Sequence, residues 1–277
     1  MTRKTVPDLL RMKADSQKIV MVTAYDYAMA RLVDTAGVDM VLVGDSVGMV
    51  VQGHQDTLSV SVEDMIYHGR CVSRGLQQAH LTVDMPFMSY QVSPAQALEN
   101  AGRLVREGRA QSVKLEGGRR SAAAISMIVE AGIPVVGHVG LTPQSVHAMG
   151  GFKVQGRGQE AADRIMQDAL AVQDAGAFCV VLEMVPEDVA AGITEALEVP
   201  TIGIGAGVGC DGQVLVCNDL LGMDLSFHPR FVKRYAQLEE TILEAMRDYA
   251  REVRSSAFPA PEHSFRRKSA AQLRRVY

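Results

Sequence analysis

The residues best suited to chemistry stand at the ends of short apolar runs. The clearest run covers residues 113–118, where apolar and ionised residues alternate before two glycines. Side chains two positions apart on a strand share a face, so Lys114 and Glu116 point the same way, roughly 6.6 Å apart along the strand. A charged face that ends in a sharp turn is typical of the mouth of a binding site rather than of a core.

Four further apolar runs end in an acid or a histidine just before a loop. They occupy residues 40–45, 81–84, 134–138 and 178–183, and they end at Asp45, Asp84, His138 and Glu183. Together with residues 113–118, five successive strands therefore deliver polar groups at the same end. A parallel barrel places its active site at the carboxyl ends of its strands, so the pattern predicts an α/β protein of the (β/α)8, or TIM barrel, type.

Asp45, Asp84 and Glu116 offer hard oxygen ligands at the ends of consecutive strands. Mg²⁺ prefers such carboxylates, with its remaining positions left to water and substrate, and no thiolate accompanies them as zinc would favour. The alternative is that each acid only caps the N-terminus of the following helix, where negative charge is favourable. Three acids in a row favour the magnesium site.

Three more polar side chains at these strand ends suit the handling of an oxygen-bearing substrate. Lys114 either pairs simply with Glu116 or, beside a metal ion, holds a substrate oxygen as charge develops on it. Glu183 follows five apolar or thiol residues. Apolar surroundings raise the pKa of a carboxylate and make it a better proton acceptor near neutral pH, unless it pairs with lysine or arginine. His138 is expected to donate an oriented hydrogen bond or to satisfy its neighbours.

Periodicity and turn residues predict the elements that position these side chains. Strands are expected at residues 18–23, 39–45, 80–84, 113–118, 134–138, 178–183, 200–204 and 213–216. Helices are expected at residues 26–36, 61–74, 94–107, 120–132, 160–175 and 186–197, with a short one within 7–17 under the barrel floor. Residues 46–53 should form a loop over the active site, and residues 229–253 one long helix before an extended tail.

Length and composition suit one globular barrel domain with a sizeable core. Its 277 residues suit one barrel, for which about 250 residues are typical, and no composition shift marks a boundary, so residues 1–277 are expected to form a single domain. The net charge of −4 gives no reason to expect nucleic acid or an anionic membrane as a partner. No apolar run approaches the roughly 18 residues of a membrane span, and no signal peptide is evident.

The cysteines, the glycine-rich stretch and the basic tail lead to simpler expectations. Cys71, Cys179, Cys210 and Cys217 lack paired zinc-ligand spacing, which indicates reduced thiols and a cytoplasmic location. Glycines at residues 203–209 do not match a dinucleotide fingerprint, which needs a following helix. Basic residues between 266 and 275 indicate a solvated or intersubunit segment rather than a binding patch.

Six stretches taken in order make the chain resemble the ketopantoate hydroxymethyltransferase family. They are TAYD at residues 23–26, VGDS at 43–46, DMPF at 84–87, VKLEGG at 113–118, GHVGLTPQ at 137–144 and PTIGIGAG at 200–207. Each piece is weak alone, but together they are highly specific and span roughly residues 5–265. The resemblance implies a (β/α)8 barrel related to the phosphoenolpyruvate/pyruvate superfamily.

The resemblance also implies an activity and a set of site residues. The family transfers a hydroxymethyl group from 5,10-methylenetetrahydrofolate to 3-methyl-2-oxobutanoate, through a Mg²⁺-stabilised enolate, and so makes 2-dehydropantoate on the route to pantothenate and coenzyme A. By resemblance, one Mg²⁺ per subunit is held at Asp45, Asp84 and Glu116. The oxo acid contacts Asp45, Ser46, Asp84, Lys114 and His138, and Glu183 accepts the proton. The family's decameric assembly implies a homo-oligomer.

Two alternative functions remain open at this point. One is another Mg²⁺-dependent lyase or phosphomutase of the same superfamily that acts on an oxo acid; such enzymes usually carry a cysteine in a KKCGH-like loop, which this sequence lacks. The other is a barrel that binds an oxo acid without turnover, against which Lys114 and Glu183 argue.

Overall fold

The computed structural model describes residues 3–224 and 229–265 and contains a closed barrel of eight parallel strands in sequence order. The strands are Ile19–Thr23 (β1), Met40–Val43 (β2), His80–Asp84 (β3), Ser112–Glu116 (β4), Val135–Gly140 (β5), Cys179–Glu183 (β6), Thr201–Ile204 (β7) and Gly212–Leu215 (β8). The predicted (β/α)8 fold class is therefore confirmed.

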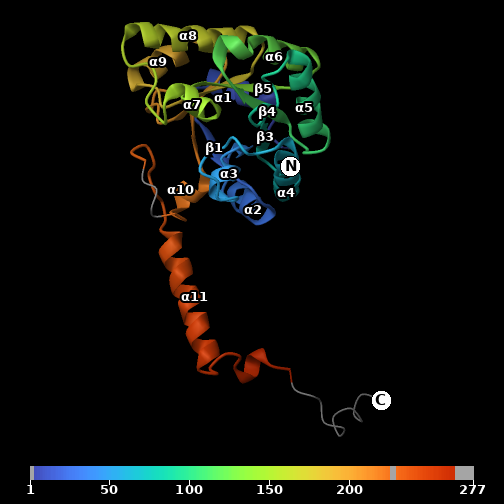
Figure 1. The fold of residues 1–277 in the computed structure, drawn as a ribbon, viewed down its shortest axis with the longest axis vertical. Coiled ribbons are helices and arrows are strands. Elements are labelled where there is room, and N and C mark those ends of the chain that lie inside the picture. Colours follow the sequence, from blue (N-terminus) through green and yellow to red (C-terminus); the bar gives the residue numbers. More distant parts are fainter. Residues whose placement is uncertain (1–2, 225–228, 266–277) are drawn as a thin grey trace.

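Helices surround the strands on the outside of the barrel, as Figure 1 shows. The described helices, including α1 at the barrel floor and α11, which projects away from the barrel, are Val6–Ala14 (α1), Tyr27–Thr35 (α2), Val47–Val50 (α3), Val62–Gly75 (α4), Pro94–Arg106 (α5), Gly118–Glu130 (α6), Val146–Met149 (α7), Gln159–Asp174 (α8), Glu187–Ala196 (α9), Cys217–Leu221 (α10) and Leu238–Arg254 (α11). Two 3₁₀ turns, Pro143–Ser145 (η1) and Pro261–His263 (η2), complete the described elements.

Alternation along each strand divides the core into two layers. On β3 and β4, Leu81, Val83, Val113 and Leu115 point outward and pack with residues of the surrounding helices. A second cluster fills the barrel itself, with inward side chains such as those of Met21 and Val136. Period-two alternation is what allows one strand to serve both layers.

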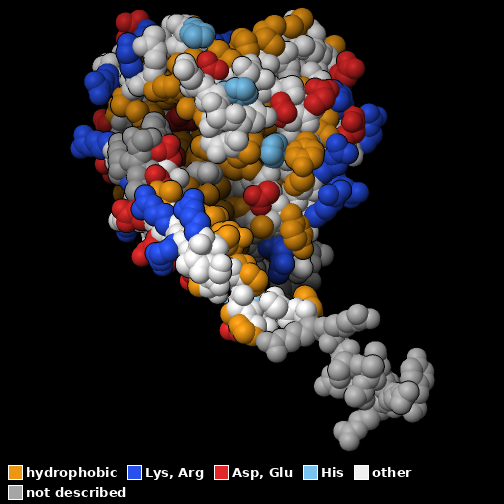
Figure 2. All heavy atoms as spheres, turned by 60° about the horizontal axis from the view of Figure 1, so that its bottom comes forward, with side chains coloured by type: hydrophobic (Ala, Val, Ile, Leu, Met, Phe, Trp, Pro, Cys, Tyr) orange, Lys and Arg blue, Asp and Glu red, His pale blue; other side chains and the backbone are white. Residues whose placement is uncertain are grey.

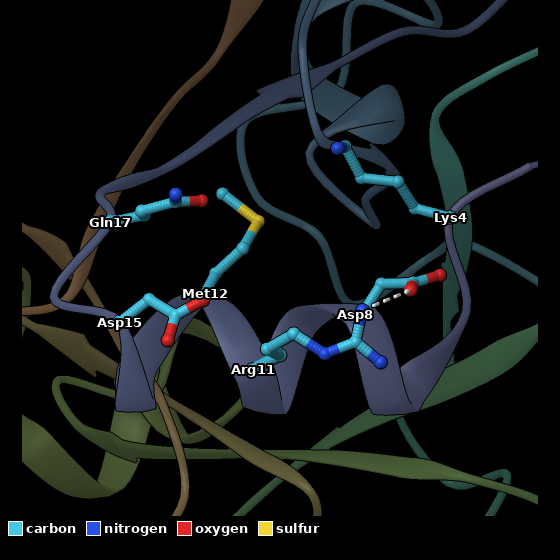
Figure 3. Close-up of a pocket in the computed structure, with 6 residues that line it drawn as sticks. All are labelled: Lys4, Asp8, Arg11, Met12, Asp15 and Gln17. Atoms are coloured by element: carbon cyan, nitrogen blue, oxygen red, sulfur yellow. Dashed lines mark ion pairs between the residues drawn. The ribbon is translucent and has the colours of Figure 1, made fainter.

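Helix α1 closes the floor of the barrel, as predicted. A capping box at Thr5 and Asp8 starts this helix, and its Leu9 is fully buried within the interior cluster. Beside α1 lies an open hollow lined by charged and polar side chains, with Arg11 3.7 Å from Asp8 (Figure 3). Its lining residues are Lys4, Asp8, Arg11, Met12, Asp15 and Gln17, so it does not include any predicted site residue.

The connection between β7 and β8 departs from the regular alternation of a (β/α)8 barrel. Residues 205–211 join these strands directly, without the helix that regular alternation would place there. Gly205 and Gly207 take positive φ values of 62° and 78°, and a Cβ on Gly207 would lie 2.4 Å from the Glu187 side chain. The glycines therefore allow a tight turn against α9, and the absence of a following helix agrees with the rejected dinucleotide fingerprint.

Two segments differ from the sequence-based expectation. Residues 46–53 contain the short helix α3, which packs so closely that a Cβ on Gly48 would lie 2.7 Å from Val60. The long helix expected at residues 229–253 begins only at Leu238, and residues 229–237 are not helical. The tail contains the η2 turn rather than only extended chain, and the basic residues from Arg266 onward lie outside the described residues.

Helix α11 projects away from the barrel (Figure 1). None of its residues is buried, and it carries exposed large apolar side chains. Within residues 3–224 and 229–265, no helix combines the length and apolarity needed to cross a membrane.

Candidate functional site

Strands β3 and β4 place three ionisable side chains inside the barrel at its carboxyl end. Asp84, Lys114 and Glu116 are only 2 %, 4 % and 2 % exposed, and the alternating outward residues anchor the same strands in the outer core. The register sets Asp84 directly beside Lys114, and the Lys114 Nζ lies 2.6 Å from Asp84 Oδ1. Lys114 thus pairs with Asp84 across strands and not simply with Glu116, as one reading of the sequence expected.

His138 links two acids on either side of it. The register sets Glu116 beside His138, with 3.3 Å between Glu116 Oε1 and His138 Nδ1. On the other side, His138 Nε2 lies 3.2 Å from Glu183 Oε2. The His138 side chain is buried, whereas that of Glu183 is 18 % exposed and is the one that reaches toward solvent. Glu183 therefore pairs with a histidine rather than with lysine or arginine.

Asp45 and Ser46 reach the site through a turn rather than through a strand. Strand β2 ends at Val43, and Asp45 follows in the turn before α3, with its backbone N–H donating to Asp84 Oδ2 at 3.1 Å. Ser46 stands at the start of α3, and its Oγ lies 2.8 Å from the Tyr25 hydroxyl. The sequence expectation that β2 runs through Asp45 is wrong by two residues, because the chain turns at Gly44.

The acids at the rim share an excess of negative charge. Burial, together with the neighbouring Asp84 and Glu116, raises the pKa of Asp45 to about 7. Burial also raises the pKa of Asp84, although Lys114 opposes this effect. Both shifts have the same physical cause, since these carboxylates are buried together in a poorly solvated space.

The pKa values of the two basic groups are raised as well, but by their acidic neighbours rather than by burial. Burial lowers the pKa of Lys114, but Asp84, Glu116 and Asp45 outweigh burial and raise it above the ordinary lysine value. Burial and Lys114 lower the pKa of His138, but its contacts with Glu116 and Glu183 raise it to about 9. Lys114 and His138 are therefore held as cations among the acids.

The donor set at the rim fits a divalent cation. Within the described part of the chain, no three His, Cys, Asp or Glu side chains stand in metal-binding geometry, and Lys114 and Gln144 contact acids of the rim. Asp84 Oδ1 is a buried oxygen whose close contact is the ion pair with Lys114 at 2.6 Å, and it has no further hydrogen bond among the described residues. Three buried carboxylate groups with hard oxygens and unbalanced charge are the ligands that Mg²⁺ prefers.

Comparison with known proteins identifies the family. The profile of the ketopantoate hydroxymethyltransferase family matches residues 3–261. The chain belongs to this family. A 3-methyl-2-oxobutanoate hydroxymethyltransferase of Syntrophotalea carbinolica is 60 % identical over 263 residues, which cover 95 % of this chain and 98 % of the relative. The enzyme of the same name from Enterococcus faecalis is 55 % identical, with 92 % of each chain covered.

Solved structures of lower identity share the fold of this ketopantoate hydroxymethyltransferase family member. A 2,3-dimethylmalate lyase, described as a PEP mutase/isocitrate lyase superfamily member, has a TM-score of 0.61 at 18 % identity and covers 98 % of this chain and 93 % of its own. A phosphonopyruvate hydrolase has a TM-score of 0.62 at 12 % identity, with 100 % and 95 % covered. These likenesses concern the barrel alone.

The structure adds two residues that the sequence did not single out. Gln144 lies in η1 and is 4 % exposed, and its side-chain amide donates to Asp45 Oδ2 at 2.9 Å. Tyr90 is 5 % exposed, and its hydroxyl donates to Gln144 Oε1 at 2.7 Å. Gln144 closes the GHVGLTPQ stretch, and this polar side chain directly after a proline at a strand end was the available signal.

The hydrogen bonds described for the acids do not support the helix-cap alternative. Asp45 accepts from the side chain of Gln144, and Glu116 accepts from the backbone N–H of Gln144, which follows β5. Asp84 accepts from the backbone of Asp45, which follows β2. In each of these bonds the acid contacts a loop after another strand, so the acids connect loops across the rim.

Proposed function

We propose that this protein transfers a hydroxymethyl group from 5,10-methylenetetrahydrofolate to 3-methyl-2-oxobutanoate, giving 2-dehydropantoate in pantothenate and coenzyme A biosynthesis. Membership of the family and the high identity to enzymes named for this reaction support the activity. The observation that carries the chemistry is the buried group of Asp45, Asp84, Lys114 and Glu116 at the carboxyl rim, with the more exposed Glu183 beside it.

Asp45, Asp84 and Glu116 would hold one Mg²⁺ per subunit. Their burial and mutual repulsion favour a cation, as the raised pKa of Asp45 indicates. When bound, Mg²⁺ supplies electrostatic stabilisation to negative charge that develops on the ketone oxygen of the oxo acid.

Lys114, His138 and Ser46 would orient the oxo acid. Lys114 and His138 are buried basic groups among acids, so they suit the carboxylate and ketone oxygens of the substrate. The Ser46 hydroxyl is held by Tyr25, which fixes it at the edge of the site. Asp45 and Asp84 complete the surroundings, and the enclosure by β3, β4 and β5 excludes water from these charges.

Glu183 would accept the proton from C3 of 3-methyl-2-oxobutanoate. Its Oε2 stands beside His138, and its partial exposure leaves room for a substrate atom to approach. Removal of that proton leaves C3 as the nucleophile for the one-carbon unit of the folate. The bonds from this carbon to the folate nitrogens break, water supplies the hydroxyl oxygen, and tetrahydrofolate leaves. A positioned base of this kind contributes about 10²–10⁴ in rate.

A coupled assay with two readouts tests this proposal. Purified full-length protein is incubated with 3-methyl-2-oxobutanoate, 5,10-methylenetetrahydrofolate and Mg²⁺, and 2-dehydropantoate is measured with and without EDTA. In parallel, exchange of the C3 hydrogen in D₂O without folate is followed by NMR. We expect metal-dependent product and metal-dependent exchange. Full product formation in the presence of EDTA would contradict the metal assignment, and no product under any condition would contradict the activity.

The two alternative functions are less well supported. A lyase or phosphomutase of the same superfamily is compatible with the barrel, but the profile and the close relatives all carry the hydroxymethyltransferase name. A barrel that only binds an oxo acid would have no use for a carboxylate placed as Glu183 is. The folate-dependent product in the assay separates all three functions.

We further infer that copies of the chain associate through α11. Four apolar residues of this helix are 41 % to 63 % exposed and stand at spacings of four, three and four, which gives one face: Ile242, Met246, Tyr249 and Val253. Hydrophobic side chains are visible on the projecting arm in Figure 2. The barrel also exposes apolar surface, since Val20 of β1, beside β8, is 48 % exposed. In this described part of the outer layer, no helix lies between β7 and β8.

The mass of the assembly in solution tests the α11 contact. A decamer is the expected size, and a Met246→Glu/Tyr249→Glu variant should shift to smaller species in light scattering. Glu244→Gln on the same helix is the matched control and should keep the wild-type mass. An unchanged mass in the double variant would contradict this contact.

A cytoplasmic location is proposed as well, supported by four cysteines that are all free thiols.

A further inference from the structure

Gln144 makes contacts at the rim that extend in several directions. Its side-chain Nε2 donates to Asp45 Oδ2 at 2.9 Å and to the backbone carbonyl of Met85 at 3.0 Å. Its backbone N–H donates to Glu116 Oε2 at 3.2 Å, and its Oε1 accepts from the Tyr90 hydroxyl at 2.7 Å. One buried residue therefore contacts two of the carboxylates assigned to the cation.

The orientation of the Gln144 amide is fixed by its neighbours. The backbone N–H of Glu116 donates to the Tyr90 hydroxyl oxygen at 3.2 Å, so the Tyr90 proton is free to go to Gln144 Oε1. The side chain of Gln91 also donates to this oxygen, at 3.2 Å. With Oε1 occupied by two donors, Nε2 must face Asp45 and Met85, and each of its two hydrogens has an acceptor.

This arrangement connects four separate segments of the rim. Asp45 follows β2, Met85 and Tyr90 follow β3, Glu116 ends β4, and Gln144 follows β5. Every donor and acceptor in the chain from Glu116 N–H through Tyr90 to Gln144 has a partner, so alternative rotamers would leave buried polar atoms unpaired. Such a loss costs about 1–3 kcal/mol for each unpaired atom, which favours a single arrangement.

We propose that Gln144, held by Tyr90, is a positioning residue that directs the carboxylates of Asp45 and Glu116 toward a common divalent cation. Gln144 contacts neither the cation nor the substrate in this role. It restrains two ligands from different loops at once, which lowers the conformational cost of bringing them together when the cation binds. The inference rests on the proposed metal-dependent function and extends it to residues without any assigned role.

Metal affinity without substrates provides the test. Free Mn²⁺, used in place of Mg²⁺ because its electron paramagnetic resonance signal disappears on binding, is titrated with full-length protein. We expect Gln144→Leu to weaken Mn²⁺ binding by about 10-fold or more, the range found when ligand-orienting partners are removed. Tyr90→Phe keeps the ring but removes the hydroxyl, and should weaken binding in the same direction by a smaller factor.

Gln96→Leu is the matched control. Gln96 bonds the backbone at Met88 and Val92, and so braces the loop that carries Tyr90 without contacting a carboxylate. We expect less than about a twofold change in Mn²⁺ affinity for this variant, because no ligand is released. A loss as large as that of Gln144→Leu would show that loop order alone matters and would overturn the proposal.

A second readout separates positioning from general stability. If Gln144 positions ligands, the product-forming activity of Gln144→Leu should recover toward the wild-type value as Mg²⁺ is raised, and the shift of the melting temperature by Mg²⁺ should need higher concentrations. Unchanged Mn²⁺ affinity in Gln144→Leu, with normal binding by the wild type, would overturn this inference alone. Failure of the wild type to bind Mn²⁺ or Mg²⁺ would overturn the metal assignment and this inference with it.

Discussion

The two ends of the barrel bury polar side chains in opposite ways. At the floor, His80 is 1 % exposed and makes hydrogen bonds to the Lys4 carbonyl at 3.1 Å and to Ser112 Oγ at 2.9 Å. At the rim, Asp45 shares its enclosed space with further carboxylates, and burial and these neighbours raise its pKa to about 7.

The comparison teaches what each end is built to do. Burial lowers the pKa of His80 to about 4, so the floor keeps a neutral side chain whose polar atoms are satisfied. Lys114 at the rim lies among three acids, Asp84, Glu116 and Asp45. One lysine cannot neutralise three carboxylates, so negative charge is left over for a cation or for a substrate with its cation. The floor therefore stabilises the fold, whereas the rim keeps carboxylates that repel one another at the end of the barrel where binding and catalysis take place.

The largest effect is expected at the rim, for Glu183→Gln. Glutamine keeps the shape of the side chain but cannot accept the C3 proton, so turnover should fall on the order of 10⁴-fold, which is about 5.5 kcal/mol. The measurement is steady-state turnover together with C3 exchange in D₂O, and binding of the oxo acid should persist. Glu160→Gln, at a side chain that is 90 % exposed, is the control. Normal exchange in Glu183→Gln would reject the role of Glu183.

Leu9→Ala at the floor should change stability and leave catalysis intact. Leu9 is fully buried inside the barrel, so the cavity should lower the free energy of unfolding by about 4 kcal/mol. Urea denaturation at fixed protein concentration measures this loss, and turnover should stay within about twofold of wild type, because the cavity lies at the opposite end from the rim. The neighbouring Leu10 is 37 % exposed, and Leu10→Ala should cost less than about 1 kcal/mol. Equal losses in both variants would contradict the buried role of Leu9.

His80 should make the floor sensitive to acid. The unfolded chain takes up the proton near pH 6.5, whereas the folded chain takes it up only near pH 4. Stability is therefore fully present above pH 6.5 and is lost as pH falls toward 4, by about 3 kcal/mol from this group. Urea midpoints between pH 4.5 and 7 should show a flatter dependence for His80→Gln than for wild type. His54→Gln, at an exposed position, should keep the wild-type slope, and the same slope in all three proteins would contradict the prediction.

The smallest effect is expected for an ion pair at the surface. Arg164 lies 2.7 Å from Glu160, nearly the distance between Lys114 and Asp84 at the rim, but its side chain is 57 % exposed. Solvent screening should limit the change in unfolding free energy for Arg164→Ala to less than about 0.5 kcal/mol. Thermal or urea unfolding measures it. A loss above about 1 kcal/mol would show that distance alone, rather than burial, governs these pairs.

Much of the barrel was predictable from the sequence because its signals are local. Alternation of apolar and polar residues placed Lys114 and Glu116 on one face, and the structure has both of them buried inside the barrel. The eight strands were found within a few residues of their observed bounds. The turn between β7 and β8 agrees with the sequence, because no helix was expected at residues 205–211 and the glycines there allow a direct turn. The catalytic and metal-binding roles stay predictions.

The sequence by itself determined which residues could form the site and that parallel strands would deliver them at one end. Only the tertiary structure decided which groups meet: Lys114 pairs with Asp84, Asp45 arrives from a turn, and Gln144 contacts acids from two other strands. The physical reason is that side-chain direction follows from a local period of two. Partnership depends on the register between strands and on loop paths, which are set by long-range packing.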